Sequence, residues 1–227
     1  MLKALIFDMD GVLVDSMPFH ARAWKKAFQD LGMEIRDEDI YAIEGSNPQK
    51  GLAVLIRNAR KEPDAYDFEI LTSIYRQEFK RIFELKAFEG VRDCLELLKT
   101  RFSLAVVSGS DHVIVHNIIN QLFPGIFEIV ITGDDVVNPK PCPDPFLKAV
   151  DFLNVKPEEC VIIENAILGV EAAKRAEIYC IGIPTYLEAS QLEKADLIVN
   201  NHEKLMEYLL RLKPDYNFED FKDKTAN

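Results

Sequence analysis

The chain has 227 residues, 48% of them hydrophobic and 29% charged, which is the composition of a soluble globular protein with one large domain or two small ones. Its formal net charge of −11 argues against a general nucleic-acid or membrane-surface binder, because both need a basic face. Four widely spaced cysteines without a Cys-x-x-Cys pair predict free thiols, not a disulfide framework or a zinc site.

The N-terminal apolar run covers residues 2–7, and acidic residues follow it at once, which does not fit a secretory signal peptide. No apolar run approaches the ~20 residues that a membrane span needs. We therefore expect a cytoplasmic protein without a membrane or nucleic-acid partner. A monomer or weak homodimer is the expected state.

Residues 2–7 predict a buried strand that ends at Asp8 and Asp10. Unpaired carboxylates inside a core are costly, so the two acids belong just past the carboxyl end of the strand. An open α/β sheet keeps its ligand crevice at that edge, and Gly11 lets the backbone turn there. The spacing is typical of a nucleophile and its acid/base partner beside a divalent metal.

Residues 15–86 predict helices and no convincing strand, with breaks at Gly45-Ser46-Asn47-Pro48 and Glu62-Pro63-Asp64. The segment is expected to be a small helical domain inserted after the first strand, where it can close over the crevice as a lid. His20 and Trp24 lie four residues apart and share one face of the first helix. From spacing alone, the favoured interpretation is that Trp24 packs and His20 caps a neighbouring carbonyl.

Between residues 87 and 212, apolar runs alternate with helical patterns. This alternation predicts a parallel sheet with helices on both faces, that is, a Rossmann-like α/β core made of residues 1–14 and 87–212. The expected further strands are 103–107, 126–131, 160–163, 179–183 and 197–199, and the expected helices are 91–98, 113–122, 146–153, 167–176 and 205–212. Residues 213–227 form a polar tail in which we expect disorder or loose packing.

Four strands end in polar loops, and these loops gather along one edge of a parallel sheet. They carry Asp8 with Asp10, Ser108, Lys140, and Glu164 with Asn165. Such oxygens suit Mg²⁺, which leaves positions for water and a substrate phosphate. The lysine would neutralise phosphoryl charge, and the serine would hydrogen-bond a phosphate oxygen. The set predicts phosphoryl transfer through an acyl-phosphate, with a second carboxylate as acid and base.

Each piece alone has an ordinary structural interpretation. Ser108-Gly109-Ser110 could be a strand-to-helix turn with a capping serine. Lys140 could be a surface charge in a proline-rich loop, and Glu164 could mark the start of a helix. The joint pattern, in order and after strands, favours the functional interpretation.

Over residues 2–212 the chain resembles the haloacid dehalogenase superfamily of phosphotransferases. The matching motifs are Asp8-Met9-Asp10-Gly11-Val12, Val107-Ser108, Lys140-Pro141, and Ile163-Glu164-Asn165 followed by Gly169 and Ala172-Ala173. The resemblance implies a Rossmann-like core with an α-helical cap domain, residues 15–86, between the first and second motifs.

The resemblance also implies roles for the motif residues. Asp8 would be the phosphoaspartyl nucleophile, Asp10 the general acid/base and Lys140 the catalytic cation. The presence of Asp10 resembles the phosphate-transferring members of the superfamily, whereas the true dehalogenases lack this second acid. The implied phosphate-binding residues are Ser108, Gly109 and Lys140, and the implied Mg²⁺ ligands are Asp8, Asp10 (through its backbone carbonyl), Glu164 and Asn165.

One departure concerns the metal site. The fourth motif usually supplies an acidic pair, and the residue that commonly binds Mg²⁺ directly is an aspartate, whereas this chain has Asn165. An amide oxygen can still coordinate, but the missing negative charge predicts weaker Mg²⁺ binding than the family norm and greater dependence on Glu164. Asn165→Asp is expected to tighten Mg²⁺ binding in isothermal titration.

Phe19-His20-Ala21-Arg22-Ala23-Trp24 and Gly45-Ser46 resemble the β-phosphoglucomutase-like group, which also contains sugar-phosphate phosphatases. This resemblance makes His20 a cap-side partner of Asp10. The implied substrate-facing cap residues are His20, Trp24, Gly45, Ser46 and Arg76.

The cap matches the mutase less well than the core does. The position of the mutase's cap lysine holds Tyr75 or Arg76, and its cap arginine has no clear counterpart near Gln49-Lys50. We therefore favour a Mg²⁺-dependent phosphatase for a small phosphorylated metabolite, such as a sugar phosphate, over a mutase-type phosphotransferase on a hexose phosphate. A binding or regulatory protein weakened by Asn165 is a third alternative.

Overall fold

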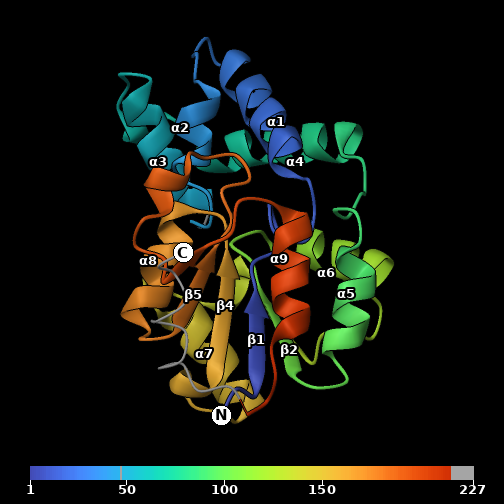
Figure 1. The fold of residues 1–227 in the computed structure, drawn as a ribbon. Coiled ribbons are helices and arrows are strands. Elements are labelled where there is room, and N and C mark those ends of the chain that lie inside the picture. Colours follow the sequence, from blue (N-terminus) through green and yellow to red (C-terminus); the bar gives the residue numbers. More distant parts are fainter. Residues whose placement is uncertain (47, 216–227) are drawn as a thin grey trace.

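The computed structural model describes residues 1–46 and 48–215, so most of the expected polar tail lies outside the described residues. Within these residues, six strands form one parallel sheet in the order β3-β2-β1-β4-β5-β6 (Figure 1). The strands are β1 Ala4–Phe7, β2 Ser103–Val107, β3 Ile129–Ile131, β4 Cys160–Glu164, β5 Tyr179–Gly182 and β6 Leu197–Ile198. The predicted Rossmann-like α/β class is confirmed.

Helices cover both faces of this sheet, and further helices lie beyond the carboxyl ends of its strands (Figure 1). Those of the sheet domain are α5 Val91–Leu98, α6 His112–Leu122, α7 Asp144–Leu153, α8 Ile167–Arg175 and α9 His202–Arg211. Those beyond the strand ends are α1 Met17–Gln29, α2 Asp37–Tyr41, α3 Pro48–Asn58 and α4 Phe68–Ile82. We call residues 15–86, which hold α1 to α4, the helical insert.

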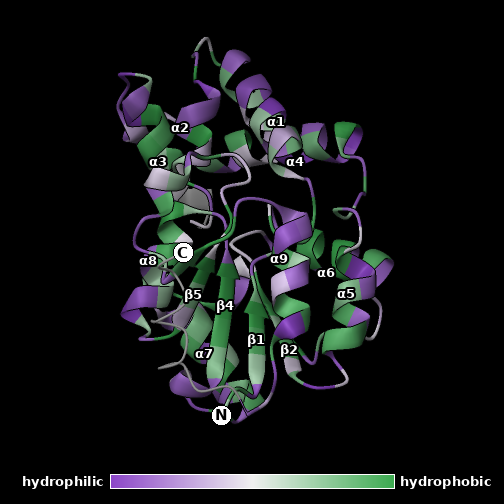
Figure 2. Cartoon of the chain, viewed as in Figure 1, coloured by the Kyte–Doolittle hydropathy of each residue, from purple (hydrophilic) through white to green (hydrophobic). Residues whose placement is uncertain are grey.

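The central strand β1 is apolar on both faces. Leu5 and Phe7 pack toward α5, α6 and α9, while Ala4 and Ile6 pack toward α7 and α8. All four side chains are at most 2% exposed, and burying each large one stabilises the fold by roughly 1.5–3 kcal/mol. The strands accordingly form the hydrophobic centre in Figure 2.

The register of the sheet places several loops at one edge. Phe7 pairs with Val106 of β2 and with Ile163 of β4. Because the strands are parallel, the residues that follow these three emerge side by side. The edge they share faces the helical insert (Figure 1).

The helical insert has a hydrophobic cluster of its own. Ala27, Phe28 and Leu55 are completely buried within it. The chain enters and leaves the insert at adjacent points: Val14 forms a β-bridge with Ala87, and the Phe88 N–H donates to the Leu13 carbonyl at 3.1 Å.

Two elements begin three residues away from the predicted position, and the other predicted boundaries differ by at most two residues. β3 begins at Ile129 and not at residue 126, because Ile126 belongs to a turn in which its N–H donates to the Phe123 carbonyl. α9 begins at His202 and not at residue 205, because the Asn201 side chain accepts from the Lys204 N–H and caps the helix.

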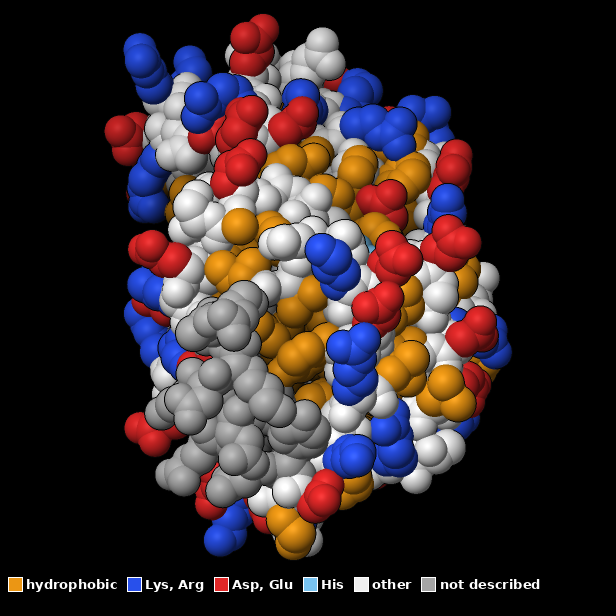
Figure 3. Space-filling view, viewed as in Figure 1, with side chains coloured by type: hydrophobic (Ala, Val, Ile, Leu, Met, Phe, Trp, Pro, Cys, Tyr) orange, Lys and Arg blue, Asp and Glu red, His pale blue; other side chains and the backbone are white. Residues whose placement is uncertain are grey.

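In the part of the chain that the structure describes, none of the helices has the length and apolar character needed to cross a bilayer. On the face shown in Figure 3, acidic and basic side chains are interspersed, with apolar side chains between them.

Candidate active site

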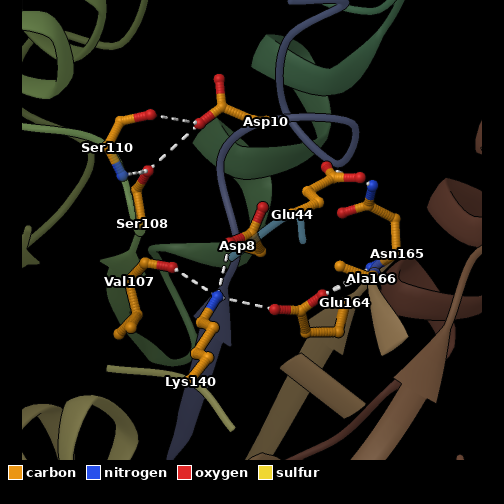
Figure 4. Close-up of polar contacts among 10 residues, drawn as sticks. All are labelled: Asp8, Asp10, Glu44, Val107, Ser108, Ser110, Lys140, Glu164, Asn165 and Ala166. Atoms are coloured by element: carbon orange, nitrogen blue, oxygen red, sulfur yellow. Dashed lines mark hydrogen bonds and ion pairs between the residues drawn. The ribbon is translucent and has the colours of Figure 1, made fainter. Parts of the chain in front are cut away.

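Asp8 directly follows β1 and is bonded to a buried lysine. Lys140 Nζ donates to Asp8 Oδ1 at 2.6 Å, to Glu164 Oε1 at 2.6 Å and to the Val107 carbonyl at 3.1 Å (Figure 4). The lysine is 2% exposed, so its whole side chain lies inside the protein. Lys140 therefore joins the ends of β1, β2 and β4, where the sequence analysis expected a catalytic cation.

Burial and neighbouring charge act on these groups in opposite directions. Burial alone would lower the pKa of Lys140, but Asp8 and Glu164 outweigh it and raise that pKa. The pKa of Asp8 is also raised: burial, Glu164 and Asp10 together outweigh the attraction of Lys140. The single positive charge of Lys140 therefore does not offset the negative charge of the carboxylates around it.

Glu164 uses both of its oxygens within the protein. Oε1 accepts from Lys140, while Oε2 accepts from the backbone N–H groups of Asn165 and Ala166, each at 2.8 Å. Gly169 permits this arrangement, since a Cβ there would lie 1.7 Å from Glu164 Oε1. In this geometry Glu164 anchors Lys140 more directly than it could anchor a metal.

Asp10 is held by four side chains. Its Oδ1 accepts from Ser16 Oγ at 2.5 Å and lies 3.2 Å from His20 Nε2. Its Oδ2 accepts from Ser108 Oγ at 3.2 Å and from Ser110 Oγ at 3.0 Å. Ser16 therefore hydrogen-bonds Asp10 and does not cap a helix. It stands at the N-cap of α1 but makes no side-chain capping bond there.

These contacts affect the protonation of Asp10. Burial would raise its pKa, but the electrostatic interaction with His20 and the hydrogen bonds to His20, Ser16 and Ser110 outweigh burial and hold the pKa below its ordinary value. Asp10 is therefore ionised at neutral pH in this arrangement.

His20 belongs to the site, and Trp24 lines the same cavity. His20 Nδ1 lies 2.6 Å from the Tyr75 hydroxyl while Nε2 faces Asp10. Trp24 stacks on the Tyr75 ring with centroids 3.9 Å apart. The interpretation of His20 as a carbonyl cap, favoured from spacing alone, is replaced by a contact with Asp10.

Gly109 and Gly45 meet where the helical insert touches the sheet domain. A Cβ at Gly109 would lie 2.7 Å from the Gly45 carbonyl oxygen, so a side chain there would force the two loops apart. Gly45 itself has a φ of +85°, which a side chain would strain. Ser46 lines the same cavity as Gly45.

Arg76, one of the expected substrate-facing residues, points elsewhere. Its Nε donates to Asp111 Oδ2 at 3.0 Å, at the start of α6, and its side chain is 56% exposed. The neighbouring Tyr75 lines the cavity instead. Arg76 thus connects α4 to the sheet domain.

Glu44 enters the site from the helical insert and is not among the residues predicted from the sequence. Its Oε1 accepts from Asn165 Nδ2 at 2.8 Å (Figure 4). Its pKa is raised well above the ordinary value by burial, with Asp8, Glu164 and Asp10 adding to that rise. No local pattern marks Glu44, because its role depends on how the insert docks.

A cavity of about 80 Å³ lies between the insert and the sheet domain. Its lining includes Asp8, Asp10, Met17, His20, Trp24, Ile40, Ile43, Glu44, Gly45, Ser46, Tyr75, Gly109, Ser110, Asp111 and Ile114. Among the described residues, no lysine or arginine lines it. Its volume is below the 300–1,000 Å³ typical of ligand pockets, so a substrate needs the insert to open.

The residues around Asp8 fit a divalent cation, although no described cluster of three or more His, Cys, Asp or Glu side chains forms a ready-made metal site. Buried carboxylates outnumber buried cations here. Two buried oxygens, Glu44 Oε2 and Asn165 Oδ1, have no hydrogen-bond partner in the described part of the chain. Unpartnered oxygens beside surplus negative charge are what Mg²⁺ would satisfy.

The chain is similar to several known proteins. The family described as haloacid dehalogenase-like hydrolase matches residues 5–183. The phosphorylated carbohydrates phosphatase of Thermotoga maritima is 33% identical over 78% of this chain and 82% of its own length. SUPPRESSOR OF QUENCHING 1, a chloroplastic protein of Arabidopsis thaliana, is 32% identical over 86% of this chain, which spans only 19% of that protein. A crystal structure of β-phosphoglucomutase from Clostridium difficile shares a TM-score of 0.77 and 25% identity, covering 93% of this chain and all of that one.

Proposed function

The chain belongs to the haloacid dehalogenase-like hydrolase family, and from that premise we propose that it is a Mg²⁺-dependent phosphatase acting on a small sugar phosphate through a phosphoaspartyl intermediate on Asp8. The observation that carries the proposal is that Asp8 and Asp10 have different hydrogen-bond partners. Lys140 orients Asp8 at 2.6 Å, whereas Asp10, two residues later, is held by serines and His20.

In the first step Asp8 attacks phosphorus and the bond to the sugar oxygen breaks. Asp10 gives its proton to that leaving oxygen. In the second step Asp10 takes a proton from a water that attacks the phosphoaspartyl group, which frees Asp8 and releases phosphate. Ser108 turns from Asp10 to a phosphate oxygen, and Lys140 stays beside the charge that develops on the phosphoryl group.

Asp10 must change protonation state between the two steps. Its lowered pKa keeps it ionised, which is the form that can take a proton from the attacking water. A phosphate dianion bound beside it would disfavour its ionised form and raise its pKa, since like charges repel. Substrate binding therefore supplies the protonated acid that the first step needs.

The metal would be held by Asp8, the backbone carbonyl of Asp10 and the amide oxygen of Asn165. When bound, Mg²⁺ supplies positive charge to the phosphate oxygens and to the surrounding carboxylates.

The cavity favours a phosphatase over a mutase. A hexose bisphosphate carries a second phosphate outside the catalytic position, and that group needs cationic partners. Lysine and arginine are absent from the described lining of the cavity, where Trp24, Ile40 and Ile43 are found instead. We therefore propose a substrate with one phosphate and a neutral sugar or polyol part.

Phosphate release from a panel of sugar monophosphates, with Mg²⁺ and with a chelator, tests the proposal. We expect Mg²⁺-dependent turnover of at least one substrate and of p-nitrophenyl phosphate. Asp8→Asn should abolish both, because it removes the nucleophile. An absence of turnover at every metal concentration would refute the phosphatase assignment.

The likeness to β-phosphoglucomutase keeps the mutase as the second candidate. Incubation with β-glucose 1-phosphate and the corresponding bisphosphate separates the two. Glucose 6-phosphate formed without free phosphate would show a mutase, whereas free phosphate and glucose would support the phosphatase.

A further inference from the structure

Glu44 lies deep between the two parts of the molecule. It belongs to the turn that joins α2 to α3 of the helical insert, yet it is only 7% exposed and contacts Asn165, which follows β4 and is 1% exposed. The next residue, Gly45, packs against the stem of Lys140. The turn therefore reaches the edge of the sheet.

The contact between Glu44 and Asn165 orients both side chains. Asn165 Nδ2 donates to Glu44 Oε1 at 2.8 Å. Because the amide nitrogen faces Glu44, the amide oxygen Oδ1 is directed into the site on the side of Asp8 (Figure 4). An asparagine at a metal position could present either end of its amide, and this hydrogen bond selects the end that can bind a cation.

One side-chain oxygen of each residue in this pair has no hydrogen bond within the described part of the chain. Glu44 Oε2 and Asn165 Oδ1 are buried and have no hydrogen-bond partner among the described residues. A buried polar atom without a partner keeps the cost of losing its water contacts, which a bound cation would offset. Lys140 does not relieve them, because its ammonium group already contacts Asp8, Glu164 and the Val107 carbonyl.

We propose that Glu44 is a ligand of the metal ion beside Asp8, and that this insert carboxylate supplies the negative charge that Asn165 lacks. The inference rests on the Mg²⁺ dependence proposed above. It adds a ligand from the helical insert to a site otherwise built from loops of the sheet domain.

A ligand from the insert connects metal binding to the closed arrangement. The ion then contacts residues of both parts of the molecule. Metal affinity and closure of the insert are therefore linked, since each favours the other.

Isothermal titration of Mg²⁺ into the purified chain and its variants tests this ligand. Glu44→Gln keeps an acceptor for Asn165 Nδ2 but removes the charge, and we expect Mg²⁺ affinity to fall at least about tenfold. Glu38→Gln is the matched control, because it removes the same charge from an exposed position of α2. Its affinity should equal that of the parent chain.

A rescue experiment sharpens the test. Asn165→Asp in the Glu44→Gln background returns a carboxylate to the sheet side of the site, and we expect it to restore the lost Mg²⁺ affinity. In the parent background the same change should increase affinity by a smaller factor, because Glu44 already supplies the charge and repels a second carboxylate.

The outcomes separate this inference from the proposed function. Unchanged Mg²⁺ affinity in Glu44→Gln overturns the ligand role, and a raised KM with unchanged affinity would assign Glu44 to the substrate instead. Absence of Mg²⁺ binding to the parent chain overturns the metal dependence itself. Circular dichroism of each variant checks that the fold is retained.

Discussion

Lys140 carries its charge into a region where only 2% of its surface is exposed. Two carboxylates, Asp8 and Glu164, offset the cost of that burial from 2.6 Å. Removing one member of a buried ion pair destabilises strongly, because the partner keeps its charge and loses its compensation. Here one lysine compensates two acids, so its loss would leave both uncompensated.

Replacing Lys140 with methionine roughly preserves volume and removes this charge. In metal-free buffer at pH 7 we expect the free energy of unfolding, measured with urea, to fall by about 3–5 kcal/mol. Adding Asp8→Asn to the variant should recover part of the loss. An unchanged unfolding free energy would contradict the buried ion pairs.

The site residues of the sheet domain could be predicted because each follows a strand. Asp8 and Ser108 come directly after β1 and β2, Glu164 is the last residue of β4, and parallel pairing brings them together. Glu44 could not be predicted in this way. It follows a short helix far from any strand, and only the docking of the insert carries it to Asn165.

At the scale of elements, the first residue of α9 contacts the segment that leaves the helical insert. His202 stacks on Phe88 with ring centroids 3.6 Å apart. Burial lowers the pKa of His202 and outweighs hydrogen bonding to the backbone of Gly11 and Val12, which favours the charged form. The native chain therefore prefers the neutral imidazole.

This preference has a pH consequence. Below its ordinary value of 6.5 the unfolded histidine takes up a proton, while the folded one stays neutral until its lower pKa is reached. Stability is thus lost as the pH falls below about 6.5. In urea unfolding between pH 7.5 and 5, His202→Gln should show a shallower loss than the parent. Parallel curves for the two proteins would contradict the assignment.

Contact between two loops limits the approach of the helical insert. Gly109→Ala would place a methyl group 2.7 Å from the Gly45 carbonyl oxygen. Because small displacements of a site are costly, with about 1 Å worth up to ~100-fold, we expect kcat/KM for phosphate release to fall at least about tenfold. The urea midpoint of the sheet domain should change little, and full activity would show that the loops separate during turnover.

Most elements of the sheet domain could be predicted, but their ends depended on local bonds. The apolar character of residues 126–131 continues through a turn, so hydrophobicity alone placed the start of β3 too early. For α9 the capping signal was Asn201, which precedes the first apolar position of that helix.

At the scale of the whole molecule, a cavity of about 80 Å³ lies between the insert and the sheet domain. Mg²⁺ with inorganic phosphate should bind there and hold the two parts together. At 100 times the dissociation constant a ligand stabilises by about 2.7 kcal/mol, which corresponds to a rise in Tm of roughly 5–10 °C for a chain of this size. Differential scanning fluorimetry checks this, and a chelator should reverse it; an unchanged Tm would contradict joint binding.

The α/β class could be predicted from alternating strands and helices, because that pattern has few packing solutions. The position of the insert relative to the sheet could not, since it depends on contacts between distant segments. The Arg76–Asp111 ion pair and the Gly45–Gly109 contact are of this kind.

The adjacent entry and exit of the insert make it an exchangeable module. Val14 pairs with Ala87, so the two ends of the 72-residue insertion lie next to each other in the sheet domain. Any replacement whose ends lie equally close would leave β1 and its neighbours in register. Exchange of the insert can therefore change which substrate is admitted while Asp8, Ser108 and Lys140 stay at the sheet edge. A replacement must also supply partners for Asp10 where Ser16 and His20 now stand.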